Sequence, residues 1–212
     1  MTEPIHQSLN RNTSKQCKAS GCYNPRRNLG GYCKNHYRKA YLYGNPNGSA
    51  ILTKDYLREI QEVNDLIDSN LNHPAVLAAC TYLQRWLDKA INGEPCVCAN
   101  EVIRVASEAT AIDVLKATSS IWLYAERNLY KINNDDYLTY HLGISFLKCA
   151  KYRVNLSTLG KSYNSIPSGS VRKAIGQQLR ETLGLFYINI VNTIRGKDES
   201  ERELKNNLYV SF

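Results

Sequence analysis

Four potential metal ligands near the start of the chain constrain its fold more than any other feature. They are Cys17, Cys22, Cys33 and His36, in a segment that reads C-x4-C, then ten residues, then C-x2-H. Structural zinc is bound tetrahedrally by four cysteine or histidine side chains, and the two ligands of each pair are usually separated by about two to four residues. Both pairs satisfy this spacing. The sequence therefore predicts one structural Zn2+ ion held by these four residues.

The composition of the same window favours a metal over free thiols. It carries five cations, Arg26, Arg27, Lys34, Arg38 and Lys39, but few aliphatic side chains. So short and polar a segment cannot bury enough apolar surface to fold by itself. Binding of structural zinc contributes about 10–16 kcal/mol to such peptides, which is enough to fold them.

The other cysteines have simpler interpretations. One residue separates Cys96 from Cys98, a spacing that chelates zinc poorly, so we interpret them as ordinary thiols; they remain an alternative source of the fourth ligand. Cys80 and Cys149 fall on apolar helical stripes, where burial is expected. Seven cysteines, an odd number, favour a reducing cytoplasm over a disulfide-bonded protein. The polar first ten residues and the lack of a long apolar run agree with a cytoplasmic location.

Positive charge is concentrated around the predicted metal site. The net charge is +8, of which residues 1–50 contribute +7 and residues 51–212 contribute +1. A localised positive field on a small module is typical of polyanion binding. We therefore expect the module to bind nucleic acid, with double-stranded DNA favoured and RNA left open. The expected contacts are the five cations and one tyrosine: Arg26, Arg27, Lys34, Arg38, Lys39 and Tyr37.

The string CKASGCYNPRRNLGGYCKNHYRKAYLYGNP resembles zinc-finger modules of treble-clef type. Such modules are often appended to HNH homing endonucleases and to other DNA-binding proteins of bacteriophages and mobile elements. Besides the ligands, the resemblance rests on Pro25-Arg26-Arg27, Gly31-Tyr32, Tyr37-Arg38 and Tyr43-Gly44-Asn45-Pro46, and it covers residues 15–48. It implies DNA contact and a short helix after the second ligand pair, and it implies nothing about catalysis. No HNH nuclease motif follows, because His73 precedes a proline at an expected helix start and His141 lies within a helical pattern.

The rest of the chain is predicted to be an all-α domain, because apolar residues recur at helical spacing throughout. The expected helices cover residues 55–71, 74–92, 100–109, 111–128, 135–149 and 170–194, and Gly196 is expected to end the last one. Residues 154–170 are expected to be a polar connection. The two helices of residues 100–128 could form a helix-turn-helix. However, the second one carries Ile121, Trp122 and Leu123, so we favour core packing.

These observations divide the chain into four expected parts. A flexible arm occupies residues 1–14, the zinc finger residues 15–48, the all-α domain residues 52–196, and a charged tail residues 197–212. The overall prediction is a mainly α-helical protein with a small N-terminal zinc finger.

Three functions are compatible with this organisation. The preferred one is a DNA-binding accessory or regulatory protein of a phage or mobile element, located in the cytoplasm of the host if viral. In it the finger contacts DNA and the helical domain binds a protein partner or dimerises. In the first alternative the zinc is purely structural and the chain is a protein–protein adaptor. The second is a nucleic-acid-processing enzyme, which would need clustered carboxylates or an activated nucleophile. Asp135-Asp136, the one adjacent acidic pair in residues 52–196, lies at an expected helix start, so we assign no catalytic residue.

Overall fold

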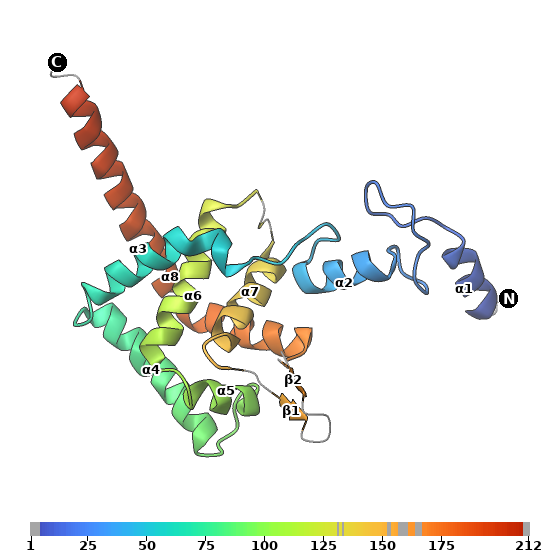
Figure 1. The fold of residues 1–212 in the computed structure, drawn as a ribbon, viewed down its shortest axis with the longest axis horizontal. Coiled ribbons are helices and arrows are strands. Elements are labelled where there is room, and N and C mark those ends of the chain that lie inside the picture. Colours follow the sequence, from blue (N-terminus) through green and yellow to red (C-terminus); the bar gives the residue numbers. More distant parts are fainter. Residues whose placement is uncertain are drawn as a thin grey trace.

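The computed structural model describes residues 5–130, 132, 134–151, 154–156, 161–163 and 167–209. The described chain is mainly α-helical and carries a Cys3His group near its N-terminus, which confirms the predicted fold class (Figure 1). Its helices are α1 Ile5–Thr13, α2 Lys34–Tyr43, α3 Leu57–Asp68, α4 Pro74–Ile91, α5 Ala99–Ala106, α6 Ala111–Arg127, α7 Asp135–Leu147 and α8 Gly169–Tyr209, with a 3-10 turn, η1, at Thr53–Tyr56. Among the described helices, none is both long and apolar enough to cross a bilayer.

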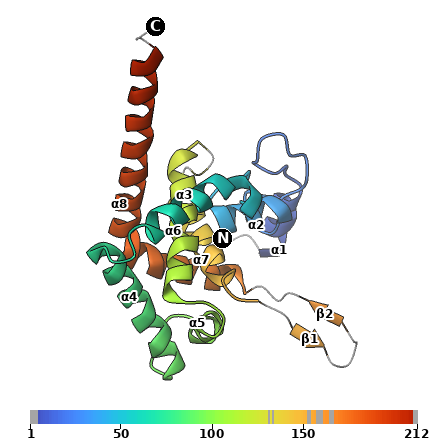
Figure 2. The ribbon, with the colours of Figure 1, turned by 60° about the vertical axis from the view of Figure 1, so that its left-hand side comes forward.

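Helices α6 and α7 form the centre of the helical body, and α3, α4 and α8 pack around them (Figures 1 and 2). In α6 every side chain from Thr118 to Ala125 is buried, which agrees with core packing rather than with a recognition helix. Trp122 of α6 stacks on Tyr187 of α8 with ring centroids 4.9 Å apart. The Tyr187 hydroxyl donates a hydrogen bond of 2.9 Å to Thr118, whereas the buried Trp122 Nε1 atom has no hydrogen-bond partner among the described residues.

Several helices begin where local capping chemistry predicts. Thr110 and Asp113 form a reciprocal capping box at the start of α6, in which the Thr110 backbone N–H donates to the Asp113 carboxylate at 3.0 Å. Pro74 is the first residue of α4, and the His73 side chain before it accepts a hydrogen bond from a backbone N–H. The Asn134 side chain caps α7 in the same way. Local sequence therefore fixes these helix starts.

The contact between α7 and α8 depends on two glycines. A Cβ atom added at Gly143 would lie 1.8 Å from the carbonyl oxygen of Arg172, and one added at Gly176 would lie 1.7 Å from that of Thr139. The two backbones therefore approach more closely than any side chain would allow.

An ion-pair network joins α3, α6 and α8. The guanidinium of Arg127 lies 2.7 Å from the Glu62 carboxylate, 2.9 Å from that of Asp198 and 3.5 Å from that of Glu59. Burial alone would lower the pKa of Arg127, but its bond to Glu62 and the other carboxylates raise it overall. Arg127 is thus an internal cross-link of the body.

Three segments contain regular structure that the sequence pattern did not predict. The arm predicted to be flexible contains helix α1. Asn12 Nδ2 in this helix donates hydrogen bonds of 2.5 and 2.8 Å to the carbonyl oxygens of Asn28 and Gly30, which attaches α1 to the segment that carries the four potential metal ligands. Gly196 does not end α8, which continues to Tyr209; the charged residues that follow have good helix propensity and outweigh one glycine. The predicted tail is therefore helical as far as Tyr209, and in Figures 1 and 2 this red part of α8 projects from the body.

The polar connection predicted for residues 154–170 contains a small hairpin instead. Strands β1 Val154–Leu156 and β2 Lys161–Tyr163 pair antiparallel, with Asn155 opposite Ser162. Strands this short show no recognisable alternation of polar and apolar residues, so the sequence pattern could not predict them.

The segment that carries the four potential metal ligands, residues 5–43, is called the metal-ligand module, and η1 with helices α3 to α8 is called the helical body. The two regions meet at the C-terminal end of α2. Tyr43 is buried in the core of the body, where its ring lies 5.1 Å from that of Tyr137 and 5.3 Å from that of Tyr140, measured between centroids. Gly44 follows with φ +64°, a left-handed conformation that glycine adopts at helix C-termini. The predicted finger segment, residues 15–48, therefore includes one side chain that belongs to the core of the body.

Candidate metal centre

Two short structures present the four ligands. Cys17 and Cys22 flank a tight loop closed by an isolated bridge between Gln16 and Pro25, and Gly21 enables its turn with φ +72°. Cys33 is the residue directly before α2, and His36 lies in the first turn of that helix. A backbone hydrogen bond of 2.9 Å from the N–H of Lys18 to the carbonyl of Gly31 ties the loop to the segment before α2.

The structure brings the four side chains into one cluster. Their ligand atoms all lie within 4.8 Å of one another. The His36 Nδ1 atom is 3.4 Å from the Sγ atoms of both Cys17 and Cys33, and the Sγ atoms of Cys22 and Cys33 are 3.9 Å apart. Tetrahedral zinc, with Zn–S near 2.3 Å and Zn–N near 2.0 Å, requires S–S and S–N separations of about 3.8 and about 3.5 Å. The residues therefore fit a tetrahedral metal ion of this size.

Hydrogen bonds to sulfur favour the thiolate form that a metal needs. The backbone N–H groups of Cys33 and Ala19 point at the Cys17 sulfur at 3.3 and 3.5 Å. Burial raises the pKa of the Cys17 thiol, but these two N–H groups and the neighbouring His36 and Cys22 side chains outweigh it and lower the pKa to about 6. Asn24 Nδ2 lies 3.7 Å from the Cys22 sulfur and gives it a similar donor. Such outer contacts orient metal ligands.

The cysteines outside the cluster do not approach it. All seven cysteines of the chain are free thiols. Cys96 and Cys98 pack against the core of the body, and the Cys98 Sγ atom lies 4.0 Å from the carbonyl oxygen of Val171. Of the two sources considered for the fourth ligand, the structure therefore brings His36 into position. With four protein ligands the group corresponds to a closed, structural site.

The predicted nucleic-acid contacts have different environments. Arg27, Lys34, Tyr37 and Arg38 are exposed, and Lys39 is half-buried. Arg26 is also half-buried. Its Nε donates a hydrogen bond of 2.8 Å to the carbonyl of Gln16, and Nη1 lies 3.5 Å from Oδ1 of Asn12. The Arg26 side chain therefore holds the loop and α1 together, so it is the least available of the six for a ligand. Nothing in the local sequence distinguishes it from Arg27.

The surface around the cluster carries charge of one sign. Residues 5–54 contain nine lysines and arginines and no aspartate or glutamate. The exposed ones include Lys15, Lys18, Arg27, Lys34 and Arg38. The module thus lacks the carboxylates that would neutralise its cations locally.

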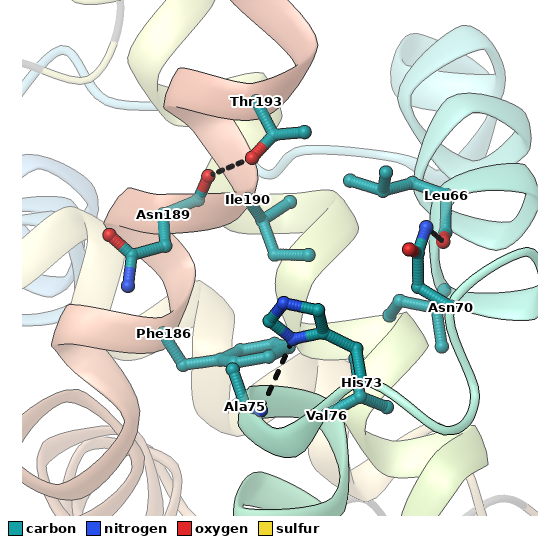
Figure 3. A pocket seen from close by; sticks show the side chains of 10 residues that line it. Leu66, Asn70, His73, Ala75, Val76, Phe186, Asn189, Ile190 and Thr193 are labelled. Carbon is teal, nitrogen blue, oxygen red and sulfur yellow. Dashed lines mark hydrogen bonds between the residues drawn. The ribbon is translucent and has the colours of Figure 1, made fainter.

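A pocket in the body lies between the α3–α4 turn and α8. It encloses about 130 Å³ and is lined mainly by apolar side chains, with Asn70, His73, Asn189 and Thr193 as its polar members (Figure 3). The His73 Nδ1 atom accepts a hydrogen bond of 3.2 Å from the N–H of Ala75, so it serves as a helix cap. No carboxylate or thiol belongs to this described lining.

A larger hollow of about 600 Å³ lies between α3, α6 and α7, and its reactive groups are already engaged. Lys116 pairs with Asp68 at 2.6 Å, and Asp113 caps α6. Burial raises the pKa of Cys149 to about 12, which makes it a poor nucleophile.

The metal-ligand cluster is therefore the group of side chains with the clearest chemical purpose among the described residues. In comparisons with known proteins, the chain matches no family model, no curated protein sequence and no solved structure.

Proposed function

We propose that this protein is a zinc-dependent DNA-binding accessory or regulatory protein of a phage or mobile element. Cys17, Cys22, Cys33 and His36 would hold one structural Zn2+ ion, and the cations around them would contact DNA. The observation that carries the proposal is the position of this tetrahedral ligand cluster within a segment that has many cations and no carboxylates.

The ligand set supports zinc as the metal. Three thiolates and one imidazole match the donor preference of zinc, whereas magnesium and calcium prefer oxygen ligands. The role of zinc in this proposal is structural. The ion would fix the loop of Cys17 and Cys22 against the start of α2, and so give the cations of the module defined positions.

The cationic surface supports phosphate contacts. Lys34 and Arg38 lie on the exposed side of α2, and Arg27 lies on the preceding loop. Phosphate contacts supply most of the sequence-independent affinity for DNA, and the logarithm of the binding constant falls by about 0.9 per contact for each tenfold increase in salt. With about five such contacts, we expect a slope of about −4.5.

The body would provide a protein contact or dimerise. Leu185 and Ile188 of α8 are 80% and 44% exposed and lie one turn apart on the helix, so together they leave apolar surface in water. These side chains support an additional contact, although they do not identify the partner.

The experiment is a titration of labelled duplex DNA across a salt series with three proteins. They are the unchanged chain, a module variant with Arg27, Lys34 and Arg38 changed to glutamate, and a body variant with Arg85 and Lys89 changed to glutamate. Arg26 is left unchanged because its side chain holds the loop. Both control positions are exposed on α4, on the far side of the body from α2 in Figures 1 and 2.

We expect binding that weakens steeply with salt, is lost in the module variant and is nearly unchanged in the body variant. Equal losses in both variants would indicate a nonspecific effect of net charge. Absence of binding at low salt would reject the proposal and favour the adaptor alternative, in which zinc only stabilises a protein-binding surface.

A further inference from the structure

The structure separates the tyrosines of the metal-ligand module into two groups. Tyr43 is buried in the core of the body, and Tyr32 packs against the ligand cluster. In contrast, Tyr23, Tyr37 and Tyr41 are 81%, 50% and 49% exposed. Exposed aromatic rings leave a large apolar area in water, so three of them on one small module suggest a ligand that covers them.

Two of these rings lie on the same face of α2 as two cations. Lys34, Tyr37, Arg38 and Tyr41 follow the i, i+3, i+4, i+7 spacing that places side chains on one side of a helix. All four are exposed. The face therefore alternates between positive charge and aromatic surface along its length.

A cation from the body continues this face. The Nζ atom of Lys173, at the start of α8, lies 5.3 Å from the centroid of the Tyr41 ring. Lys173 also pairs with Asp136 at 3.2 Å, which holds it in this position. Thus one positive group, Lys173, lies over the ring of the second tyrosine, and another, Arg38, lies between the two tyrosines on the helix face.

The spacing of the rings favours bases that are not stacked in a duplex. Positions four residues apart on a helix differ by about 6 Å along its axis, whereas consecutive base pairs of a duplex are about 3.4 Å apart. Bases in a duplex also bury their faces against each other. Aromatic side chains interleaved with cations are the features by which proteins bind single strands, with bases stacked on the rings and phosphates near the charges.

We infer that the face formed by Lys34, Tyr37, Arg38 and Tyr41 binds unpaired bases of nucleic acid. The preferred ligand is accordingly a single strand or a duplex with a single-stranded stretch. This inference rests on the proposed nucleic-acid function and names the form of the ligand. Phosphate contacts alone would still give weaker, salt-dependent binding to a duplex.

The test compares a labelled single-stranded oligothymidylate with a blunt duplex of the same length at one salt concentration. The variants are Tyr37→Ala and Tyr41→Ala, each with a phenylalanine variant that keeps the ring. Tyr130→Ala is the control, because Tyr130 is 76% exposed but belongs to the body. Metal content and thermal melting are measured for every variant, since the Tyr41 ring also lies close to Gly169.

We expect the single strand to bind at least about 5-fold more tightly than the duplex. Each alanine variant should weaken single-strand binding by about 5- to 100-fold, the range for one stacked base, with less than about 2-fold change for the duplex. The phenylalanine variants and Tyr130→Ala should bind like the unchanged chain. Binding of both ligands that is unchanged in the two alanine variants would overturn this inference but leave the proposed function standing. If neither the single strand nor the duplex bound, both this inference and the proposed function would be rejected.

Discussion

The metal-ligand module and the helical body achieve order in different ways. Among the described residues of the module only Cys17, Ala19 and Cys33 form a buried hydrophobic cluster, and two of these three belong to the Cys3His group that could hold a metal. Among the described residues, the core of the body contains 36 buried hydrophobic residues, of which 35 come from η1, α3 to α8 and the adjoining segments and one, Tyr43, from α2. The body can therefore fold by burying apolar surface, whereas we expect the module to need a bound metal.

The two regions nevertheless share one side chain. Tyr43 ends the helix that carries His36, and its ring is buried among Tyr137, Tyr140 and His141 of α7. A change in the module is thus expected to reach the body through α2, although the body does not need the metal for its own core.

The largest expected effect is loss of the metal. Cys33→Ser removes one thiolate and should abolish stoichiometric metal binding, because structural zinc contributes about 10–16 kcal/mol to modules of this kind. We expect the amide resonances of the module to collapse while most of the helical circular-dichroism signal remains. Metal analysis and NMR check this.

Cys96→Ser is the matched control, because Cys96 lies outside the cluster. It should leave metal content unchanged. Complete unfolding of the chain in Cys33→Ser would show that the body is not independent.

Substitutions at the contact between α7 and α8 should destabilise the body without affecting the module. Alanine at Gly143 or Gly176 places a methyl group within 2 Å of a backbone carbonyl of the opposite helix, so we expect a loss of about 3 kcal/mol or more in the free energy of unfolding. Urea denaturation measures this loss, and metal content should be retained.

Gly196→Ala provides the comparison within α8. Nothing lies within 4 Å of the added Cβ, so the variant should be neutral or stabilise the helix by up to about 1 kcal/mol. Equal stabilities for the variants at 176 and 196 would contradict the close approach of α7 and α8.

The junction itself is tested by Tyr43→Ala. Removal of a buried aromatic ring should lower the free energy of unfolding of the body by about 3 kcal/mol, although Tyr43 belongs to the predicted finger segment. Tyr23→Ala is the control within the module, because Tyr23 is 81% exposed. If the two variants melted at the same temperature, the module would not be docked on the body.

A smaller effect depends on pH and on His141. Burial, together with the positive charges of Lys148 and Arg172, lowers the pKa of His141 from its ordinary 6.5 to about 3. Between these values the unfolded chain binds a proton that the folded chain does not, so stability falls as the pH falls below 6.5. The loss is up to about 1.4 kcal/mol per pH unit.

His141→Phe should remove this part of the pH dependence. The His141 Nε2 atom has no hydrogen-bond partner among the described residues, so phenylalanine forfeits no bond there. Urea denaturation of both proteins at pH 7 and pH 4.5 isolates the difference. Parallel losses in the two proteins would show that His141 is not the group responsible.

Short-range chemistry made much of the structure predictable. The ligand spacing predicted the Cys3His group, and Thr110 and Asn134 cap α6 and α7 at the residues where the sequence predicted these helices to begin. Apolar stripes predicted the helices that build the core. Each of these signals is contained within a few neighbouring residues.

What could not be predicted depends on contacts between distant segments. The role of Arg26 depends on where the carbonyl of Gln16 lies, and the burial of Tyr43 depends on α7. Helix α1 is attached through the bonds of Asn12 to the distant residues Asn28 and Gly30, and nothing in the sequence around Asn12 indicates these partners. The sequence predicted contacts from Lys34, Tyr37 and Arg38 of α2, but only the fold shows that Tyr41 is exposed beside them whereas Tyr43 is buried.

The most direct test of the account compares metal-loaded and metal-stripped protein in their binding to labelled DNA across a salt series. We expect the loaded protein to contain one zinc ion per chain and to bind with a salt slope of about −4.5. We also expect that stripping abolishes binding and that added zinc restores it. Equal binding by stripped protein would show that the ligand cluster does not organise the contact surface, and would contradict the account.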